Sequence, residues 1–330
     1  MAMCSWWKRQ RWRYFDSRQL SRQNYSSFAK TRPPSETSRR MNEAELILND
    51  DGSIYHLGIR TEHCAPLIIT VGDPGRVPTV SQFFDQIDFK HQNREICIHT
   101  GILGNRPISV ISTGMGTDNI DIVFNELDAL FTLDLKTRKP LDSPTPLTFI
   151  RLGTSGSIQA DIEINSLVVA HAAIGFDNLM HYYDSNMCDH PTAVSIYKHL
   201  GIPKKMNHPY YVKGDPKLVK DCLKLGIQKG TTATNPGFYA PQGRHLRTKN
   251  ILSYNIENLI SFNNNNCLIT NFDMETAGMY GLSQVLGHRA ISISAILANR
   301  YYGTFSDQPD QTIHNMIDLV TKAIKAGSFT

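Results

Sequence analysis

The chain has 330 residues, of which 41% are hydrophobic and 19% are charged. This composition excludes a mainly disordered chain, because there is enough apolar material for a sizeable core. No run of about 18 apolar residues occurs, so we expect no membrane-spanning helix and no membrane partner. The six cysteines are scattered without a C-x-x-C pair. This spacing argues against a zinc ribbon or a disulfide scaffold and favours a reducing compartment such as the cytoplasm.

The charge is divided unevenly along the chain. Residues 1–41 hold ten Lys/Arg against two acidic residues, a net charge of +8, so the overall +4 leaves −4 for the remainder. The mildly acidic remainder offers no broad basic surface, and nucleic acid is therefore not an expected partner. We predict a basic, disordered extension over 1–41 and one domain over 42–330. The Arg-rich, acid-poor residues 1–40 are also typical of mitochondrial transit peptides, which is the alternative to a cytoplasmic location.

In chain order, the hydrophobic pattern predicts alternating strands and helices. Strands are expected over 67–72, 95–103, 107–113, 147–152, 166–173, 230–234 and 290–298, with a hairpin turn at Gly104-Asn105. Helices are expected over 119–135, with Asp118 as N-cap, and over 217–225, 275–286 and 312–326. Several strands are apolar throughout, which indicates helices on both sheet faces. We therefore expect an α/β fold, a single domain whose large mixed central sheet is partly barrel-like and is covered by helices on both sides.

Several common catalytic motifs are absent from the sequence. There is no G-x-x-x-x-G-K-[ST] phosphate loop and no G-x-S-x-G nucleophile elbow. Residues 114–119 begin like the G-x-G-x-x-G dinucleotide motif but lack its last glycine. The twelve histidines include no H-E-x-x-H and no metal-spaced cluster, so we expect no metal site.

Two predicted strand ends combine glycine with arginine, in the sequences GDPGR at 72–76 and RLGTSG at 151–156. Ligands of α/β proteins bind at the carboxyl ends of strands. Glycines let backbone N–H groups approach an anion, and guanidinium groups bind its oxygens in pairs. Arg76 alone is what a surface turn would show, whereas Arg151 inside an apolar strand requires a charged partner. Together the two segments predict a cradle for a small dianion such as phosphate.

Five short motifs follow one another along the chain: VGDPGRV at 71–77, STGMG at 112–116, RLGTSG at 151–156, FYAPQGR at 238–244 and DMET at 273–276. This ordered set resembles the nucleoside phosphorylase family, and within it the uridine phosphorylases. The resemblance covers about residues 50–327. Each motif alone has an ordinary structural explanation, and their joint order is what points to the family.

The resemblance implies a pentosyltransferase of pyrimidine salvage. Inorganic phosphate attacks the anomeric carbon of uridine, and uracil and ribose 1-phosphate leave. Phosphate is then a co-substrate and no cofactor is expected. The resemblance assigns phosphate binding to the Gly72 backbone, Arg76, Arg151 and Thr154. It also matches Arg94 to an arginine that reaches in from the neighbouring subunit of a homodimer with shared active sites.

The nucleoside-binding residues follow from the same resemblance. His56 matches a histidine that crosses to the ribose 5′-hydroxyl of the partner subunit's site, and the Met274 backbone and Glu275 hold the 2′- and 3′-hydroxyls. The base would be bound and its loop ordered by four side chains, namely Phe238, Gln242, Arg244 and Arg300.

These residue types suit the chemistry of the implied reaction. Breaking the glycosidic bond builds positive charge on the ribose and negative charge on the leaving base. An ionised Glu275 and the phosphate stabilise the first charge, while Gln242 and Arg244 stabilise the second, so a strong general acid is not required. The expected catalytic residues are Arg76, Arg94, Arg151 and Glu275.

The base preference depends on the loop after the last main strand. Purine-specific relatives place an aspartate there, whereas this chain has Asn299-Arg300, as uridine phosphorylases do. Two alternatives stay open, a purine nucleoside or methylthioadenosine phosphorylase and a catalytically silent nucleoside-binding paralogue. The second is suggested by departures from the family pattern, because Pro241 precedes the loop glutamine and Asp118 and Asp121 add negative charge near the expected site.

Overall fold

The computed structural model describes residues 40–248, 256–264 and 267–329. The extension predicted over 1–41 lies outside these residues except for Arg40 and Met41. None of the described helices combines the length and the apolar composition needed to cross a membrane.

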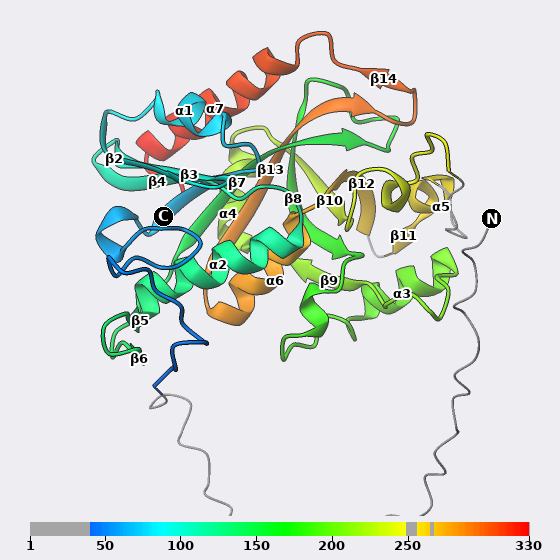
Figure 1. Cartoon of the computed structure of the whole chain (residues 1–330). Coiled ribbons are helices and arrows are strands. Elements are labelled where there is room, and N and C mark those ends of the chain that lie inside the picture. Colours follow the sequence, from blue (N-terminus) through cyan, green and yellow to red (C-terminus); the bar gives the residue numbers. More distant parts are fainter. Residues whose placement is uncertain (1–39, 249–255, 265–266, 330) are drawn as a thin grey trace, which may run out of the picture. The chain divides into compact units, whose positions relative to one another are not determined.

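The described residues form a mixed sheet of twelve strands in the order β11-β12-β10-β8-β13-β7-β1-β4-β3-β2, with β14 beside β13 and β9 beside β8 (Figure 1). The strands are β1 Leu67–Val71, β2 Gln86–Asn93, β3 Ile96–Leu103, β4 Arg106–Ser112, β7 Thr148–Ser157, β8 Leu167–Gly175, β9 Tyr210–Lys213, β10 Gln228–Thr234, β11 Asn263–Asn264, β12 Cys267–Asp273, β13 Arg289–Asn299 and β14 Thr304–Phe305. A separate small ribbon pairs β5 Leu133–Asp134 with β6 Lys139–Pro140.

One further pairing closes part of this sheet into a barrel. The end of β12 runs antiparallel to the end of β7, with Asn271 opposite Ser157 and Phe272 opposite Gly156. Because β7, β13, β8, β10 and β12 are already neighbours in that order, this contact completes a ring of five strands. The strands β1, β4, β3 and β2 extend the sheet outward from β7. The partly barrel-like mixed sheet predicted from the sequence is therefore confirmed.

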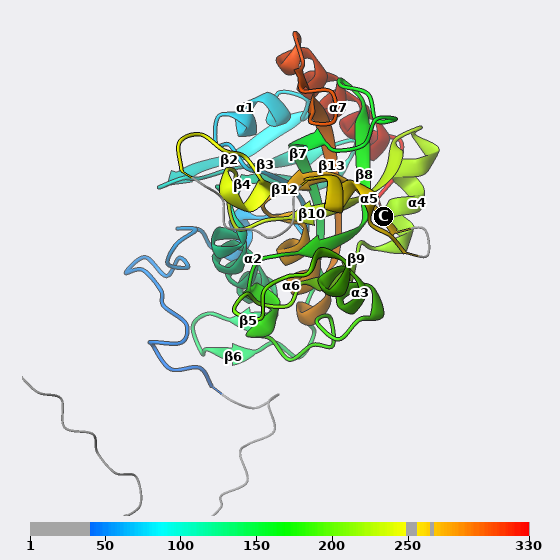
Figure 2. The ribbon, with the colours of Figure 1, turned by 90° about the vertical axis from the view of Figure 1, so that its right-hand side faces the viewer.

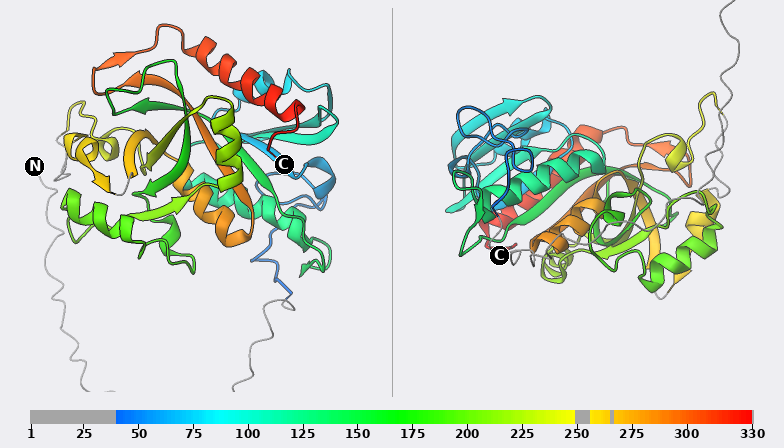
Figure 3. Two further views of the ribbon diagram at one scale, coloured as in Figure 1. Left: turned by 180° about the vertical axis from the view of Figure 1, so that it is seen from behind. Right: turned by 60° about the horizontal axis from the view of Figure 1, so that its bottom comes forward.

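Helices cover both faces of the sheet, as predicted. Helices α2 Thr117–Thr132 and α6 Thr276–Leu286 pack on one face, and α1 Arg76–Ser81, α4 Pro216–Lys224 and α7 Pro309–Lys325 pack on the other (Figures 1 and 3). Helices α3 Pro191–Leu200 and α5 Ile256–Ser261 cover the strands at the β12 end (Figure 2). Short 3₁₀ helices span Thr61–His63, Leu179–His181 and Ala240–Gln242. The apolar period of α2 is the reason for its place, since Ile120, Phe124 and Leu127 are buried against the sheet.

Two local predictions are wrong. The α2 N-cap is Gly116, with φ 93°, and Asp118 lies one residue inside the helix, where its charge suits the positive end of the helix dipole. The strand predicted to end at Leu152 continues through the glycines to Ser157. It continues because β13 pairs with β7 along its whole length, from Arg289 opposite Thr148 onward.

Candidate active site

A cavity of about 850 Å³ opens at the carboxyl ends of β1, β7, β12 and β13. It brings together parts of the chain that are more than 200 residues apart. Ten residues singled out from the sequence line it, namely Gly72, Arg76, Arg151, Thr154, Phe238, Gln242, Arg244, Met274, Glu275 and Arg300. Its volume falls within the range usual for small-molecule sites.

Two arginines meet at one end of the cavity. Arg76 stands at the start of α1, directly after the turn that follows β1, and its Nη1 donates to the Leu152 carbonyl at 3.4 Å. That contact brings it to the strand that holds Arg151. Burial lowers the pKa of Arg76, and the positive charge of Arg151 lowers it further. Two neighbouring cations that face one cavity form a site whose mutual repulsion a bound anion would relieve.

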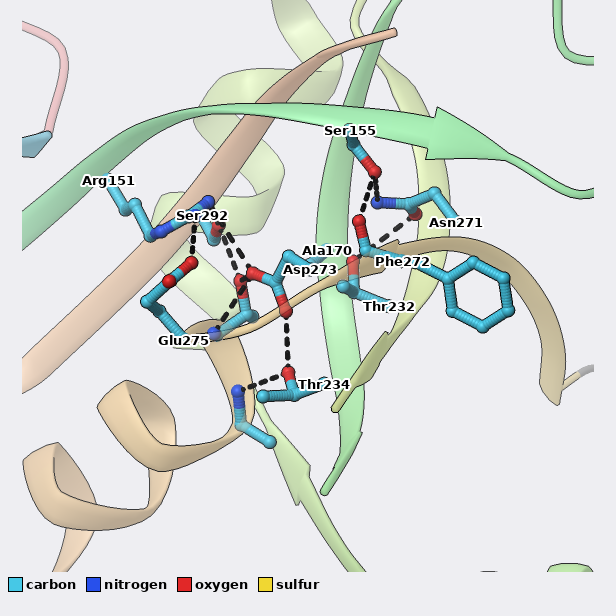
Figure 4. Close-up of polar contacts among 12 residues, drawn as sticks. Arg151, Ser155, Ala170, Thr232, Thr234, Asn271, Phe272, Asp273, Glu275 and Ser292 are labelled. Carbon is cyan, nitrogen blue, oxygen red and sulfur yellow. Dashed lines mark hydrogen bonds and ion pairs between the residues drawn. The ribbon is translucent and has the colours of Figure 1, made fainter. Parts of the chain in front are cut away.

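Arg151 is the centre of a buried ion-pair network (Figure 4). It is only 6% exposed, its Nη2 lies 2.5 Å from Glu275 Oε2, and its Nη1 lies 3.5 Å from Asp273 Oδ2. Burial acts to lower the pKa of Arg151, but attraction to Glu275 and Asp273 outweighs it and the pKa is raised. The charged partner that an arginine inside an apolar strand requires is thus a pair of carboxylates.

The glycine after Arg151 makes room for this arginine. Residues two apart on a strand share a face, so a side chain at position 153 would stand beside Arg151. A Cβ on Gly153 would lie only 1.9 Å from Arg151 Nη1. Gly153 therefore lets the guanidinium fold along β7 toward Glu275.

Glu275 and Asp273 are held by the junction between β12 and α6. Glu275 is 5% exposed, and besides Arg151 its carboxylate accepts the Gly116 N–H at 2.8 Å. Burial raises the pKa of Glu275, and the positive charge of Arg151 and the hydrogen bond from Gly116 offset part of this rise. Asp273 accepts the Thr234 hydroxyl at 2.7 Å and the Thr276 N–H at 3.0 Å, which fixes the first turn of α6 (Figure 4).

The other end of the cavity is built from the loop after β10. Arg244 stacks its guanidinium 3.7 Å from the centre of the Phe238 ring, and its Nη1 donates to the Phe238 carbonyl at 2.7 Å and to Gln242 Oε1 at 2.5 Å. Arg300 donates to the Gln242 backbone carbonyl from the end of β13. Burial and the neighbouring Arg300 lower the pKa of Arg244 to about 10. Pro241 lies within the 3₁₀ turn that contains Gln242, so its fixed φ suits the turn.

A model of the phosphorylase superfamily matches residues 66–326. The chain is 30% identical over 264 residues to the uridine phosphorylase of Thermococcus kodakarensis, covering 79% of this chain and 83% of that protein. The chain belongs to the phosphorylase superfamily. The crystal structure of a Trypanosoma brucei nucleoside phosphorylase, described as showing uridine phosphorylase activity, superposes with a TM-score of 0.77 at 30% identity. It covers 86% of this chain and 100% of its own.

The superfamily includes relatives with another base preference. The purine nucleoside phosphorylase of Listeria monocytogenes is 25% identical over 277 residues, covering 81% of this chain and 97% of that protein. Membership in the superfamily therefore leaves the base open, and the base preference has to be argued from the cavity.

Two residues assigned from the resemblance, His56 and Arg94, are not among those that line this cavity. Arg94 is exposed at the tip of the β2–β3 hairpin with φ 55°, and His56 pairs with Glu126 on α2. The two aspartates that the sequence places near the site do not line it either. Asp118 is exposed, and Asp121 accepts the Tyr183 hydroxyl at 2.5 Å, so neither adds charge to the cavity wall.

The sequence analysis gave no role to two residues of the cavity mouth, although one of them, Met115, lies within the STGMG motif. Phe305 on β14 and Met115 in the loop before α2 line the cavity although they are 67% and 76% exposed. The sequence signal for this strand was the glycine at position 303. It adopts φ 69° and turns the chain back so that β14 pairs with β13. In the described part of the chain, no group of three or more His, Cys, Asp or Glu side chains could hold a metal ion.

Proposed function

We propose that the protein is a uridine phosphorylase, which splits uridine with inorganic phosphate into uracil and ribose 1-phosphate. The observation that carries the proposal is one cavity with Arg76 and Arg151 at one end, Glu275 against Arg151, and Gln242 with Arg244 at the other end. The names of the Thermococcus and Trypanosoma relatives support the same activity.

In the proposed reaction the phosphate binds between the Gly72 backbone, Arg76, Arg151 and Thr154. Its negative charge offsets the repulsion between the two guanidinium groups, so phosphate binding and arginine placement favour each other. A phosphate oxygen attacks the anomeric carbon while the bond to the uracil nitrogen breaks. The bonding electrons leave with the base as the new C–O bond forms.

The ribose lies next to Glu275, whose carboxylate accepts a hydrogen bond from the 2′-hydroxyl, while the Met274 backbone binds the neighbouring hydroxyl. An ionised carboxylate stabilises the positive charge that develops on the ribose. The pair with Arg151 keeps Glu275 oriented for this role before substrate arrives.

At the base end, Gln242 and Arg244 donate to the carbonyl-rich edge of uracil and stabilise its developing negative charge, while Phe238 packs against the ring. Arg300 holds the backbone of Gln242 in place. A purine base is disfavoured by the chemistry of residues 299–303, which contain no acid. Asn299 itself is 3% exposed and donates to the carbonyls of Gln159 and Ile162, so its side chain is occupied by the fold.

We also propose a cytoplasmic homodimer with shared sites, in which His56 and Arg94 complete the partner subunit's cavity. Their positions outside the cavity of their own chain support this arrangement. The five cysteines among the described residues are free thiols, as a reducing compartment would require.

The test is to incubate the protein with uridine, thymidine or adenosine, with and without phosphate, and to follow base release by absorbance. Uracil release that depends on phosphate is expected. Adenine release would replace the proposal with a purine or methylthioadenosine phosphorylase, and binding without turnover would replace it with a silent paralogue. Arg94→Ala should abolish phosphate-dependent turnover, and near-normal phosphorolysis by this variant would remove the shared-site arrangement.

A further inference from the structure

The Glu126 carboxylate on α2 forms its hydrogen bonds with a segment about 70 residues earlier in the chain. Its carboxylate accepts the His56 N–H at 3.0 and 3.1 Å and the Leu57 N–H at 2.9 Å. The His56 ring follows, with Nδ1 at 2.5 Å from Glu126 Oε1. The Glu126 carboxylate thus binds both the backbone and the ring of His56, the residue that the proposed function places in the partner subunit's site.

The rest of the His56 segment is fixed as well. Asn93 Nδ2 donates to the His56 carbonyl at 2.9 Å, and Leu57 is fully buried. Gly58 has φ 64°, and a Cβ there would lie 2.8 Å from His91 Nε2. The ring nitrogen Nε2 of His56 makes no hydrogen bond to the described residues, and this side chain is 31% exposed against 14% for Glu126. Nε2 is therefore the polar atom of this ring that can meet a ligand.

We propose that Glu126 is a positioning residue that selects nucleosides with a free 5′-hydroxyl. The inference rests on the proposed function, in which His56 meets the ribose 5′ end. A carboxylate can only accept, so it requires a proton on Nδ1, and in a ring that carries one proton the lone pair is then at Nε2. That lone pair accepts a hydrogen bond from a 5′-hydroxyl. A 5′-phosphate dianion has no hydrogen to donate and meets the negative charge of Glu126 behind the ring, so nucleotides are disfavoured.

A carboxylate that served only to hold the chain together would affect every substrate equally. A positioning carboxylate affects only substrates that have the 5′-hydroxyl. The comparison of uridine with 5′-deoxyuridine separates these two roles, because the two molecules differ only in the group that His56 is proposed to bind.

The test uses Glu126→Gln, which keeps the size of the side chain and removes its charge. We expect kcat/KM for uridine to fall roughly 10-fold to 100-fold, the usual worth of a hydrogen bond to a charged or oriented group, while kcat/KM for 5′-deoxyuridine changes less than about 2-fold. His56→Ala should give the same pattern. Adding Glu126→Gln to His56→Ala should cause no further loss, because both act through one ring. Glu257→Gln, an exposed charge on α5, is the matched control.

Equal losses on the two substrates, or an unchanged ratio between them, would overturn the inference and leave uridine phosphorolysis standing. A wild-type protein that releases no uracil from either substrate would overturn the proposed function and this inference with it. If Glu126→Gln does not fold, nitrogen NMR of the wild-type His56 ring decides the matter. A proton on Nδ1 is expected, and a ring that carries its single proton on Nε2 would contradict the proposal.

Discussion

At one end of the cavity, Arg151 and Glu275 stand on β7 and at the start of α6, where they are 6% and 5% exposed. At the other end, Phe238 and Arg244 stand on a loop, and Phe238 is 50% exposed. The first end is held by ion pairs to the barrel strands, so its chemistry and its folding depend on the same contacts. The second end is held mainly by contacts within its own loop and by Arg300, so recognition there can change while the fold stays intact.

Arg151→Met should have the largest effect, because it removes a proposed phosphate ligand and leaves two buried carboxylates without their partner. We expect kcat/KM to fall more than about 1,000-fold and the free energy of unfolding to fall by about 3–5 kcal/mol. Urea unfolding and phosphorolysis assays measure the two losses. Arg289→Met removes a partly exposed pair with Asp215 and should cost less than about 1 kcal/mol. A fully stable Arg151→Met protein would contradict the comparison.

Glu275→Gln keeps the shape of the buried end but removes the charge that is proposed to face the ribose. We expect kcat to fall roughly 100-fold to 1,000-fold. Phosphate should still raise the melting temperature of this variant, because Arg76 and Arg151 both remain. If phosphate protection disappears together with turnover, then Glu275 acts on the phosphate site rather than on the ribose.

Arg244→Ala tests the loop end. The loss of its proposed hydrogen bonds to the base should lower kcat/KM for uridine roughly 10-fold to 100-fold, while the free energy of unfolding stays within about 0.5 kcal/mol of wild type. Arg247→Ala, an exposed arginine in the same loop, is the control and should leave both quantities unchanged. A large loss of stability in Arg244→Ala would show that the loop end, like the Arg151 end, also stabilises the fold.

High pH should have the smallest effect, because it changes the charge at one end of the cavity before the other. The pKa of Arg151 is raised by its carboxylates, whereas the pKa of Arg244 is lowered to about 10 by burial and by Arg300. Arg244 is therefore charged below pH 10 and loses its charge as the pH rises through that value, while Arg151 stays charged. The pKa of Arg76 is lowered as well, by burial and by Arg151. Activity on uridine should therefore decline there, while the part of the phosphate protection against unfolding that depends on Arg151 persists. Arg244→Gln should lack this part of the decline, and an identical alkaline profile in the variant would assign the decline to uridine itself.

The sequence predicted the regular elements best where their hydrophobic pattern was strong. The β3–β4 hairpin is an example, since Gly104 and Asn105 both have positive φ as its two-residue turn requires. Strand β2 was missed because its residues alternate between exposed and half-buried and many are polar. Strand β12 was missed because its role depends on partners β10 and β7 that lie far away in the sequence.

The candidate site was predictable as a set of residues but not as an arrangement. The resemblance pointed to ten of the residues that line the cavity. It could not indicate that Arg151 pairs with Glu275, because their distance is decided by the way β7 and α6 meet in the fold. Nor could it find Glu126, since a glutamate on the flank of an amphipathic helix is what any solvated helix face would show.

The contact that completes the five-strand ring lies at Gly156 and Phe272, two residues before Met274, and it is reinforced by the Ser155 hydroxyl, which donates to the Phe272 carbonyl at 2.6 Å (Figure 4). A closed ring cannot part its strands to admit a nucleoside without breaking these bonds. Entry and exit must therefore run past Phe238 and Phe305 at the mouth. The entrance is thus formed by the loop that carries Phe238 and by β14, which carries Phe305.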